Sequence, residues 1–466
     1  MHVLIINGSP AGKYSITLQT ALFLEKSFPS CRFSFLEPGR RIKSCEKDFA
    51  PCQEALEAAD LIVFCYPVYT FLVPAQLHRF IELMKERGVN VAGKFATQLS
   101  TSKHFYDTTA HRFIQDNCAD LGLRYIRGLS ADMEDLTTEK GRREAVDFFR
   151  FVRWSMANGV TEQAPTFAPR ETQPVSVPDE QAEKKDGEVV VVTDLSRDDG
   201  TLRAMIDRFI RRTGREVRTV DLAEFPFAGG CLGCFHCASD GKCVYKDGFD
   251  DYLRSNIQSA QAIVYAFSVK DHSMGYRFKL YDDRQFCNGH RTVTMGKPVG
   301  YLVDGDVTSE PNLRLMLEAR AQVGGNFLAG IATNEADPDG AIDRMAATLD
   351  YAVDNAYQPP ADFLGVGGMK IFRDLIYQMR GLMKADHRFY KQHGFYKDFP
   401  QKHRAKSAAM YLVGGMMTNK KLQKKMGNKM NEGMVMPYQA ALKKAVPVED
   451  PAPAEEEEPV AAARQI

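Results

Sequence analysis

HVLIINGSP, residues 2–10, decides the fold of this chain, because EVVVVTDLS at residues 188–196 repeats its pattern of an apolar run followed by a polar turn. Two further runs recur in the same order in both halves: ADLIVFCYPVY from Ala59 with AQAIVYAFSVK from Ala260, and GKFATQLSTS from Gly93 with GKPVGYLVDGD from Gly296. These runs are mostly apolar on both faces, which is typical of parallel strands buried between helices. Because helical patterns alternate with the runs, we predict two tandem, doubly wound α/β sheets.

The length and composition are those of a globular protein with more than one domain. The chain has 466 residues, which is more than one hydrophobic core usually serves. Hydrophobic residues make up 44% and charged residues 26%, as is ordinary for a globular protein. Residues 161–187 are rich in Pro, Thr, Gln and Glu, as linkers are. We predict a first domain at 1–160, a linker at 161–187, a second domain at 188–358, a helical basic extension at 359–446 and a disordered acidic tail at 447–466.

The cell compartment follows from the terminus and from the cysteines. MHVLIINGSP has no basic leader, and no later stretch approaches the length of a membrane-spanning helix, so we expect a cytoplasmic protein. Thiols stay reduced in the cytoplasm. The ten cysteines are therefore interpreted as metal ligands, buried residues or redox groups rather than as disulfides.

The turn after the first strand has the residues of a phosphate-binding loop. Gly8, Ser9 and Pro10 are followed by Ser15 and Thr17, where a helix is expected to begin. Small and hydroxylated residues at such a turn let backbone N–H groups and the positive end of the helix dipole approach a phosphate. An ordinary turn with a Ser or Thr helix cap has the same appearance. No Walker lysine–serine pair follows, so a nucleoside triphosphate is not indicated.

Two further loops lie at the same expected edge of the first sheet. The first is Tyr66 to Thr70, YPVYT, and the second is Ser100 to Ser102. Ligands of open α/β sheets bind outside the carboxyl ends of the strands, where a tyrosine can stack on a flat ring. Tyr69 as ordinary core packing is the alternative.

Together the three loops resemble those of the flavodoxin-like, NAD(P)H-dependent FMN reductases. The resemblance covers nearly all of residues 1–155 and implies FMN as cofactor and NAD(P)H as electron donor. One departure is Ala11, where many relatives carry a basic residue, so weaker phosphate binding is expected. The resemblance implies phosphate ligands at Ser9, Ser15 and Thr17, ring contacts at Pro67, Val68, Tyr69 and Thr70, and a far wall at Ser100, Thr101 and Ser102.

Four cysteines lie in GGCLGCFHCASDGKC, residues 229–243, at Cys231, Cys234, Cys237 and Cys243. Their spacing lets one loop turn four thiolates towards a single metal ion or iron–sulfur cluster. The motif resembles that of the iron–sulfur flavoproteins, which implies a 4Fe–4S cluster beside a flavin and assembly from like subunits. A structural zinc site and a metal-free cysteine loop remain alternatives. Cys45 and Cys52 are interpreted as an eroded copy of the motif.

The two halves of the chain are expected to bind different cofactors. The second turn carries Asp194, Asp198 and Asp199, which would repel a phosphate, so FMN is expected only in the first half. The predicted function is an NAD(P)H-dependent FMN oxidoreductase that passes electrons through the cluster to a small-molecule or protein acceptor. A non-enzymatic electron carrier and a flavin-free zinc scaffold are the alternatives, and no acid or base residue is assigned.

The basic extension and the charge balance bear on partners. Lys+Arg and Asp+Glu both number 60, and no recognised nucleic-acid-binding fold accompanies the basic stretch, so no nucleic-acid partner is expected. Between Gly367 and Ala445 basic residues far outnumber acidic ones and methionine is frequent. This pattern is typical of peripheral contact with an anionic membrane or of a partner-binding surface. A basic face folded against the acidic tail explains it equally well.

Overall fold

The computed structural model describes residues 1–163, 170–195, 200–234 and 236–417. Residues Met1–Phe395 form one compact unit and Tyr396–Ile466 a second. The predicted acidic tail at 447–466, and the part of the basic extension after residue 417, lie outside the described residues. No helix in the described ranges is both long and apolar enough to span a bilayer.

The first sheet has the strand order β2-β1-β3-β4-β5, with β6 also paired to β4, and every pairing is parallel. Its strands are β1 His2–Asn7, β2 Arg32–Leu36, β3 Leu61–Pro67, β4 Phe95–Ser102, β5 Arg124–Tyr125 and β6 Leu129–Asp132. The helical segments between them are η1 Gly12–Tyr14, α1 Ile16–Ser27, α2 Pro38–Lys47, α3 Ala50–Ala58, α4 Ala75–Glu86, α5 Asp107–Asp120, η2 Asp135–Thr137 and α6 Glu139–Asn158.

The second sheet has the order β11-β10-β9-β7-β8, again with parallel pairings throughout. Its strands are β7 Glu188–Thr193, β8 Glu216–Asp221, β9 Ala262–Ser268, β10 Pro298–Asp304 and β11 Phe327–Thr333. The helical segments are α7 Gly200–Arg212, α8 His236–Asp240, α9 Phe249–Tyr252, η3 Leu253–Ile257, α10 Gly275–Arg284, η4 Gln285–Asn288, α11 Pro311–Gly324 and α12 Pro338–Asp354.

Both sheets have the flavodoxin order, in which the chain crosses from the second strand back past the first to the third. This confirms the predicted fold of two tandem flavodoxin-like sheets. The carboxyl ends of the first and third strands flank the point where the winding reverses, and ligands of such sheets bind there. In the first sheet these ends are Asn7 and Pro67, which lead into two of the predicted FMN loops.

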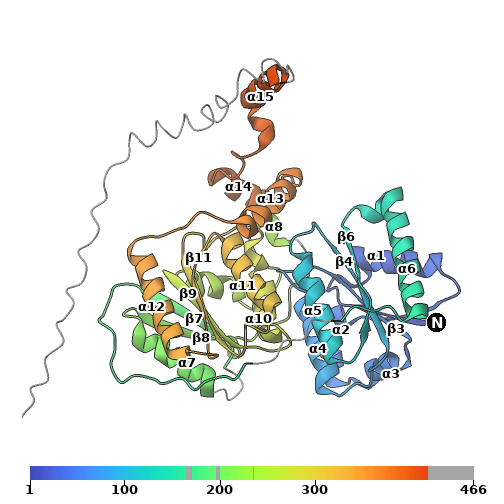
Figure 1. The fold of residues 1–466 in the computed structure, drawn as a ribbon, viewed down its shortest axis with the longest axis horizontal. Helices are drawn as coiled ribbons and strands as arrows, with labels where there is room; N and C mark the ends of the chain where they lie inside the picture. Colours follow the sequence, from blue (N-terminus) through green and yellow to red (C-terminus); the bar gives the residue numbers. More distant parts are fainter. Residues whose placement is uncertain (164–169, 196–199, 235, 418–466) are drawn as a thin grey trace, which may run out of the picture. The chain divides into compact units, whose positions relative to one another are not determined.

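Side chains of each central strand alternate between two apolar layers. Val3 and Ile5 of β1 pack with α1 and α6, whereas Leu4 and Ile6 face α3, α4 and α5. The second sheet packs α7 and α12 on its outer face (Figure 1). Its inner layer, with α10 and α11, is continuous with the inner layer of the first sheet. The two domains therefore share one apolar core, and α4 of the first packs directly on α10 of the second.

The linker and the extension follow the second domain closely. Arg170 N donates to Asp306 Oδ2 (2.7 Å) and Gln173 N to the Asn334 carbonyl (2.6 Å), so the linker passes the carboxyl ends of β10 and β11. Two helices follow the second domain, α13 Phe363–Gln378 and α14 Lys384–Gln392, and α13 packs on α11. In the second unit the described part holds η5 Pro400–Lys402 and α15 Arg404–Met417.

Candidate functional site

The first loop places a helix start at the carboxyl end of β1. Ser15 caps α1, because its Oγ accepts a hydrogen bond from Leu18 N at 3.3 Å. Ser9 Oγ accepts from Ala11 N at 3.3 Å and is nearly fully buried. The first turn of α1 therefore leaves backbone N–H groups without helical partners, an arrangement that suits an anion.

The second loop has an uncommon backbone. Tyr69 N donates to the Leu72 carbonyl (2.8 Å) and Leu72 N to the Tyr69 carbonyl (3.0 Å). Between them Thr70 (φ 42°) and Phe71 (φ 70°) adopt the left-handed conformation, which non-glycine residues rarely take. Such strain persists only where the surroundings hold it, and it clusters at ligand sites.

The third loop is tied to the first by side chains. The Thr17 and Thr101 hydroxyl oxygens lie 2.5 Å apart and are buried. Ser100 Oγ lies 2.7 Å from His111 Nε2, and burial lowers the pKa of His111 to about 4, so the imidazole is neutral at pH 7. Thr17 and Ser100 are thus engaged within the protein, and neither lines the cavity described next.

A cavity of about 490 Å³ lies at these three loops and extends into the second domain. Its lining includes two further groups of residues that the motifs did not indicate: Lys103, Phe105 and Met133 of the first domain, and Asn288 and His290 after α10. The predicted FMN residues that line it are Ser9, Ser15, Pro67, Val68, Tyr69, Thr70, Thr101 and Ser102.

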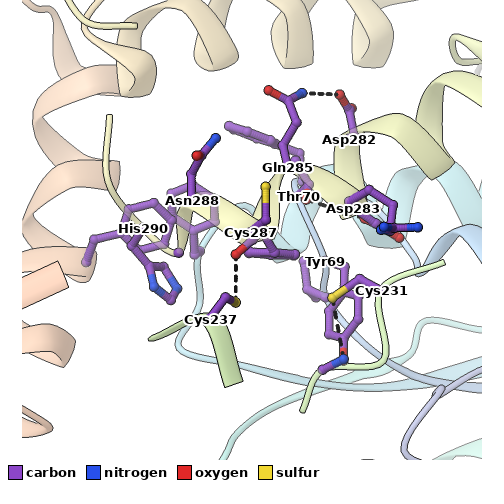
Figure 2. A pocket seen from close by; sticks show the side chains of 18 of the residues that line it. Tyr69, Thr70, Cys231, Cys237, Asp282, Asp283, Gln285, Cys287, Asn288 and His290 are labelled. Atoms are coloured by element: carbon purple, nitrogen blue, oxygen red, sulfur yellow. Dashed lines mark hydrogen bonds between the residues drawn. The ribbon is translucent and has the colours of Figure 1, made fainter. Parts of the chain in front are cut away.

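All four cysteines of the motif line the same cavity. Figure 2 shows Cys231 and Cys237 in one view with Tyr69. Cys237 Sγ donates to the Phe286 carbonyl (2.8 Å), and Cys231 Sγ accepts from Gly233 N (3.4 Å). Burial raises the pKa of the Cys231 thiol well above its usual range. Burial, followed by the nearby Cys234 and Cys243, raises the pKa of Cys237 to about 11. Cys231 and Cys237 are thus thiols that resist ionisation, and both line the cavity.

The sulfur spacing bears on which metal centre fits. A zinc tetrahedron, with Zn–S of about 2.3 Å, brings its sulfur atoms to about 3.8 Å from one another. Among the residues that the structure describes, the only three metal-ligand side chains whose ligand atoms lie within 4.8 Å of one another are those of His78, Glu82 and Asp271. No three of the four cysteine sulfur atoms therefore lie within 4.8 Å of one another in the structure. A multi-iron cluster separates its cysteine ligands, because each binds a different iron.

The cluster of His78, Glu82 and Asp271 lies where α4 meets the second domain. Lys270 Nζ is 3.1 Å from Glu82 Oε1, and Lys85 Nζ is 3.1 Å from Asp271 Oδ1. Because lysines already neutralise both carboxylates, this cluster is best interpreted as part of the domain interface.

The extension closes one side of the cavity. Ile371, Phe372 and Leu375 of α13 line it, and the Phe372 ring stacks on Phe105 of the third loop, with centroids 4.1 Å apart. Asp386 of α14 is fully buried, and its Oδ2 accepts from His290 N at 3.2 Å. Residues far apart in the chain thus complete the wall of the cavity beside the third loop.

Comparison with known proteins finds a family that the first part of the chain resembles. Residues 1–113 match the model of a family described as NADPH-dependent FMN reductase. This part of the chain resembles an FMN reductase. The match confirms the resemblance drawn from the three loops, and with it the prediction of an NAD(P)H-dependent FMN oxidoreductase. The matched segment ends before the cysteine motif.

Several solved structures are similar to part of this chain. The FMN-dependent NADH-azoreductase from Bacillus anthracis, in complex with FMN, is 11% identical, and the alignment covers 34% of this chain and 99% of that one with a TM-score of 0.26. The flavoenzyme NAD(P)H:(acceptor) oxidoreductase FerB from Paracoccus denitrificans is 16% identical, with 34% and 95% covered and a TM-score of 0.28. The NAD(P)H:quinone oxidoreductase from Methanothermobacter marburgensis is 14% identical, with 35% and 98% covered and a TM-score of 0.26. No curated protein matches the sequence.

Proposed function

We propose that this FMN oxidoreductase passes electrons from NAD(P)H, through FMN, to an iron–sulfur cluster held by Cys231, Cys234, Cys237 and Cys243, and from there to an acceptor. The observation that carries the proposal is the single cavity, which is lined both by the FMN loops of the first domain and by all four cysteines of the second. Electron transfer between two redox groups requires them to lie close together, and one shared cavity supplies that proximity.

The FMN side of the cavity offers a suitable surface for each end of the cofactor. The start of α1 with Ser9 and Ser15 suits the phosphate, and the backbone and ring at Pro67 to Thr70 suit the flat ring system. Thr101 and Ser102 form the far wall. FMN, when bound, accepts a hydride and releases single electrons, and the protein contributes position and surroundings.

The cysteine side touches the flavin side directly. Gly233, between Cys231 and Cys234, approaches the Tyr69 hydroxyl so closely that a side chain on this residue would clash with it. Gly233 also has a positive φ of 63°, so a substitution there is strained as well as crowded. Burial, followed by the neighbouring thiol of Cys231, raises the pKa of Tyr69 well above its usual range. Tyr69 is therefore a neutral hydroxyl that lies between the two parts of the site.

The test is anaerobic purification of the full chain with iron, sulfide, zinc and flavin analysis. We expect a brown protein whose iron is lost in Cys234→Ser while FMN stays bound, because the flavin loops belong to the other domain. Cys31→Ser, which changes a cysteine outside the cavity, is the matched control and should keep its iron. Stoichiometric zinc in place of iron after anaerobic reconstitution would contradict the proposal.

The same preparation separates an enzyme from a carrier. A reductase oxidises NAD(P)H in the steady state when given an artificial electron acceptor. A carrier that is fed by a partner protein shows almost no such turnover, even though its flavin and iron are intact.

A further inference from the structure

Helix α10 of the second domain carries four charged side chains that are almost completely buried. Asp282 (2% exposed) pairs with Arg320 of α11 in the same domain, and the other three are Lys279 (1%), Asp283 (0%) and Arg284 (1%). A buried charge is costly unless it is paired and hydrogen-bonded. The groups that these three side chains contact therefore show what the helix holds in place.

Lys279 and Asp283 hold the second flavin loop of the first domain. Their charged groups form an ion pair, and Lys279 Nζ also donates to the Tyr69 carbonyl at 2.7 Å. Asp283 accepts hydrogen bonds from Ala75 N at 2.7 Å and from Thr70 Oγ1 at 3.4 Å. The pair thus binds both ends of the segment that contains the two left-handed residues, Thr70 and Phe71. Figure 2 shows Thr70 and Asp283 side by side.

Arg284, the next residue of the helix, holds the cysteine loop. Its guanidinium makes two hydrogen bonds of 2.7 Å to the carboxylate of Asp247 and one of 3.0 Å to the Gly229 carbonyl. It also lies over the Tyr245 ring, 4.4 Å from the centroid. Gly229 and Tyr245 bracket the cysteine motif at 231–243, so this one side chain fixes both ends of the motif.

We propose that α10 is the element that sets the flavin loop and the cysteine loop in register, with Lys279 and Asp283 as positioning residues for the flavin ring and Arg284 as the positioning residue for the cysteines. This inference rests on the proposed function. It also makes the second domain part of the FMN site, because the ring loop is held from outside the first domain. Within one chain, the tandem arrangement supplies the second half of the site.

The structure contains an internal control for this inference. The loop Lys270 to Ser273 repeats the bridge of Tyr69 to Leu72, and Asp271 (φ 52°) and His272 (φ 58°) repeat its left-handed pair. Glu82 of α4 accepts from Tyr276 N at 2.9 Å, as Asp283 accepts from Ala75 N. His78 and Glu82 therefore occupy the positions on α4 that Lys279 and Asp283 occupy on α10, but they face a loop outside the predicted FMN site.

The experiment uses the full chain and the FMN dissociation constant, measured by quenching of FMN fluorescence. Lys279→Met and Asp283→Asn should each weaken FMN binding by about tenfold, which corresponds to about 1.4 kcal/mol. At saturating FMN the visible bands of the bound flavin should shift in both variants, because the ring wall has moved. Glu82→Gln and His78→Gln remove buried partners from the same interface and should leave affinity and spectrum unchanged.

Thr70→Val covers the case in which a charge variant does not fold, because it leaves the ion pair intact and removes only the hydroxyl that donates to Asp283. It should shift the flavin spectrum in the same direction. Equal losses of FMN affinity in the α4 and α10 variants would mean that each substitution only loosens the interface, and this result would overturn the proposal. Unchanged FMN affinity in Lys279→Met would overturn it as well.

Arg284→Lys tests the cysteine side, since lysine keeps the charge but cannot make the two-pronged contact with Asp247. We expect the iron content to fall by about half or more while FMN affinity is retained. Unchanged iron would refute the role of Arg284. If the wild-type chain holds no iron, the proposed function fails, whereas the FMN measurements on Lys279 and Asp283 still decide the flavin half of the inference.

Discussion

Among single residues, two histidines show how burial and hydrogen-bond partners set the pKa of a side chain. His111 stays neutral because burial lowers its pKa, and it is thereby fit to hydrogen-bond with Ser100 beside the third loop. His272 behaves in the opposite way. Burial alone would lower its pKa, but hydrogen bonds to Asp120 of the first domain and Glu310 of the second raise it to about 10.

His272 predicts how the stability of the chain depends on pH. A histidine whose pKa is raised from 6.5 to about 10 on folding contributes stability that is complete below pH 6.5 and is lost as the pH rises towards 10. Because the side chains of His272 and Asp120 are partly exposed to solvent, we expect this contribution to be about 1 kcal/mol.

Thermal unfolding of the wild type and of His272→Gln at pH 6 and pH 9.5 measures this contribution. The wild type should be more stable than the variant at pH 6, and the two should converge at pH 9.5. A difference that is the same at both pH values would show that the imidazole charge does not matter. His2→Gln, which changes a histidine on β1, serves as a control.

At the scale of elements, the extension forms part of the site. α13 presents Phe372 to the cavity and stacks it on Phe105, while Phe363 at the start of the same helix is 84% exposed. One face of the helix therefore seals the flavin side, and the opposite face is open to solvent. Linker and extension sequences are often assigned no function, but here a helix after the second sheet touches a loop of the first.

Phe372→Ala is expected to loosen this wall. Losing a stacked and half-buried ring should cost about 2 kcal/mol of stability and speed the release of FMN, because the third loop loses its support. The measurements are the melting temperature and the rate of FMN dissociation on dilution. Phe363→Ala, on the exposed side of the same helix, should change neither quantity. An unchanged dissociation rate in Phe372→Ala would mean that α13 does not contribute to retention of the cofactor.

At the scale of the whole molecule, two similar domains contribute different parts to one site. The first contributes the loops that are predicted to bind FMN. In the second, Asp194 at the end of β7 pairs with Arg277 (3.1 Å), and the linker passes the carboxyl ends of β10 and β11. The aspartates Asp198 and Asp199 of that turn lie outside the described residues.

This asymmetry predicts one FMN per chain. The linker covers the carboxyl ends of β10 and β11 in the second sheet, whereas the loops at the carboxyl edge of the first sheet line the cavity. Titration of the cofactor-free full chain with FMN should saturate at one equivalent, and Ser15→Asp, which places a carboxylate at the start of α1, should abolish binding. A second equivalent of comparable affinity would show that the second domain also binds FMN.

Local sequence patterns were enough to predict the two sheets, and they also located the cysteine motif and the three loops that are predicted to bind FMN. These features are local: strand burial follows from runs such as VVVV at 189–192, and a phosphate loop follows from small residues between a strand and a helix. Most of the predicted loop residues line the cavity. Sequence could not show that Thr17 and Ser100 turn inward, because their partners Thr101 and His111 belong to other elements.

The contacts that join the two sides of the cavity could be found only in the folded chain. Lys279 and Tyr69, Phe372 and Phe105, and Gly233 and Tyr69 are distant in the chain and meet because the two sheets share one apolar core. The hydrophobic periodicity of the sequence does not indicate these contacts, because each partner has the ordinary pattern of its own helix, strand or loop. Because α4 docks on α10, the predicted FMN loops and the cysteine motif line the same cavity.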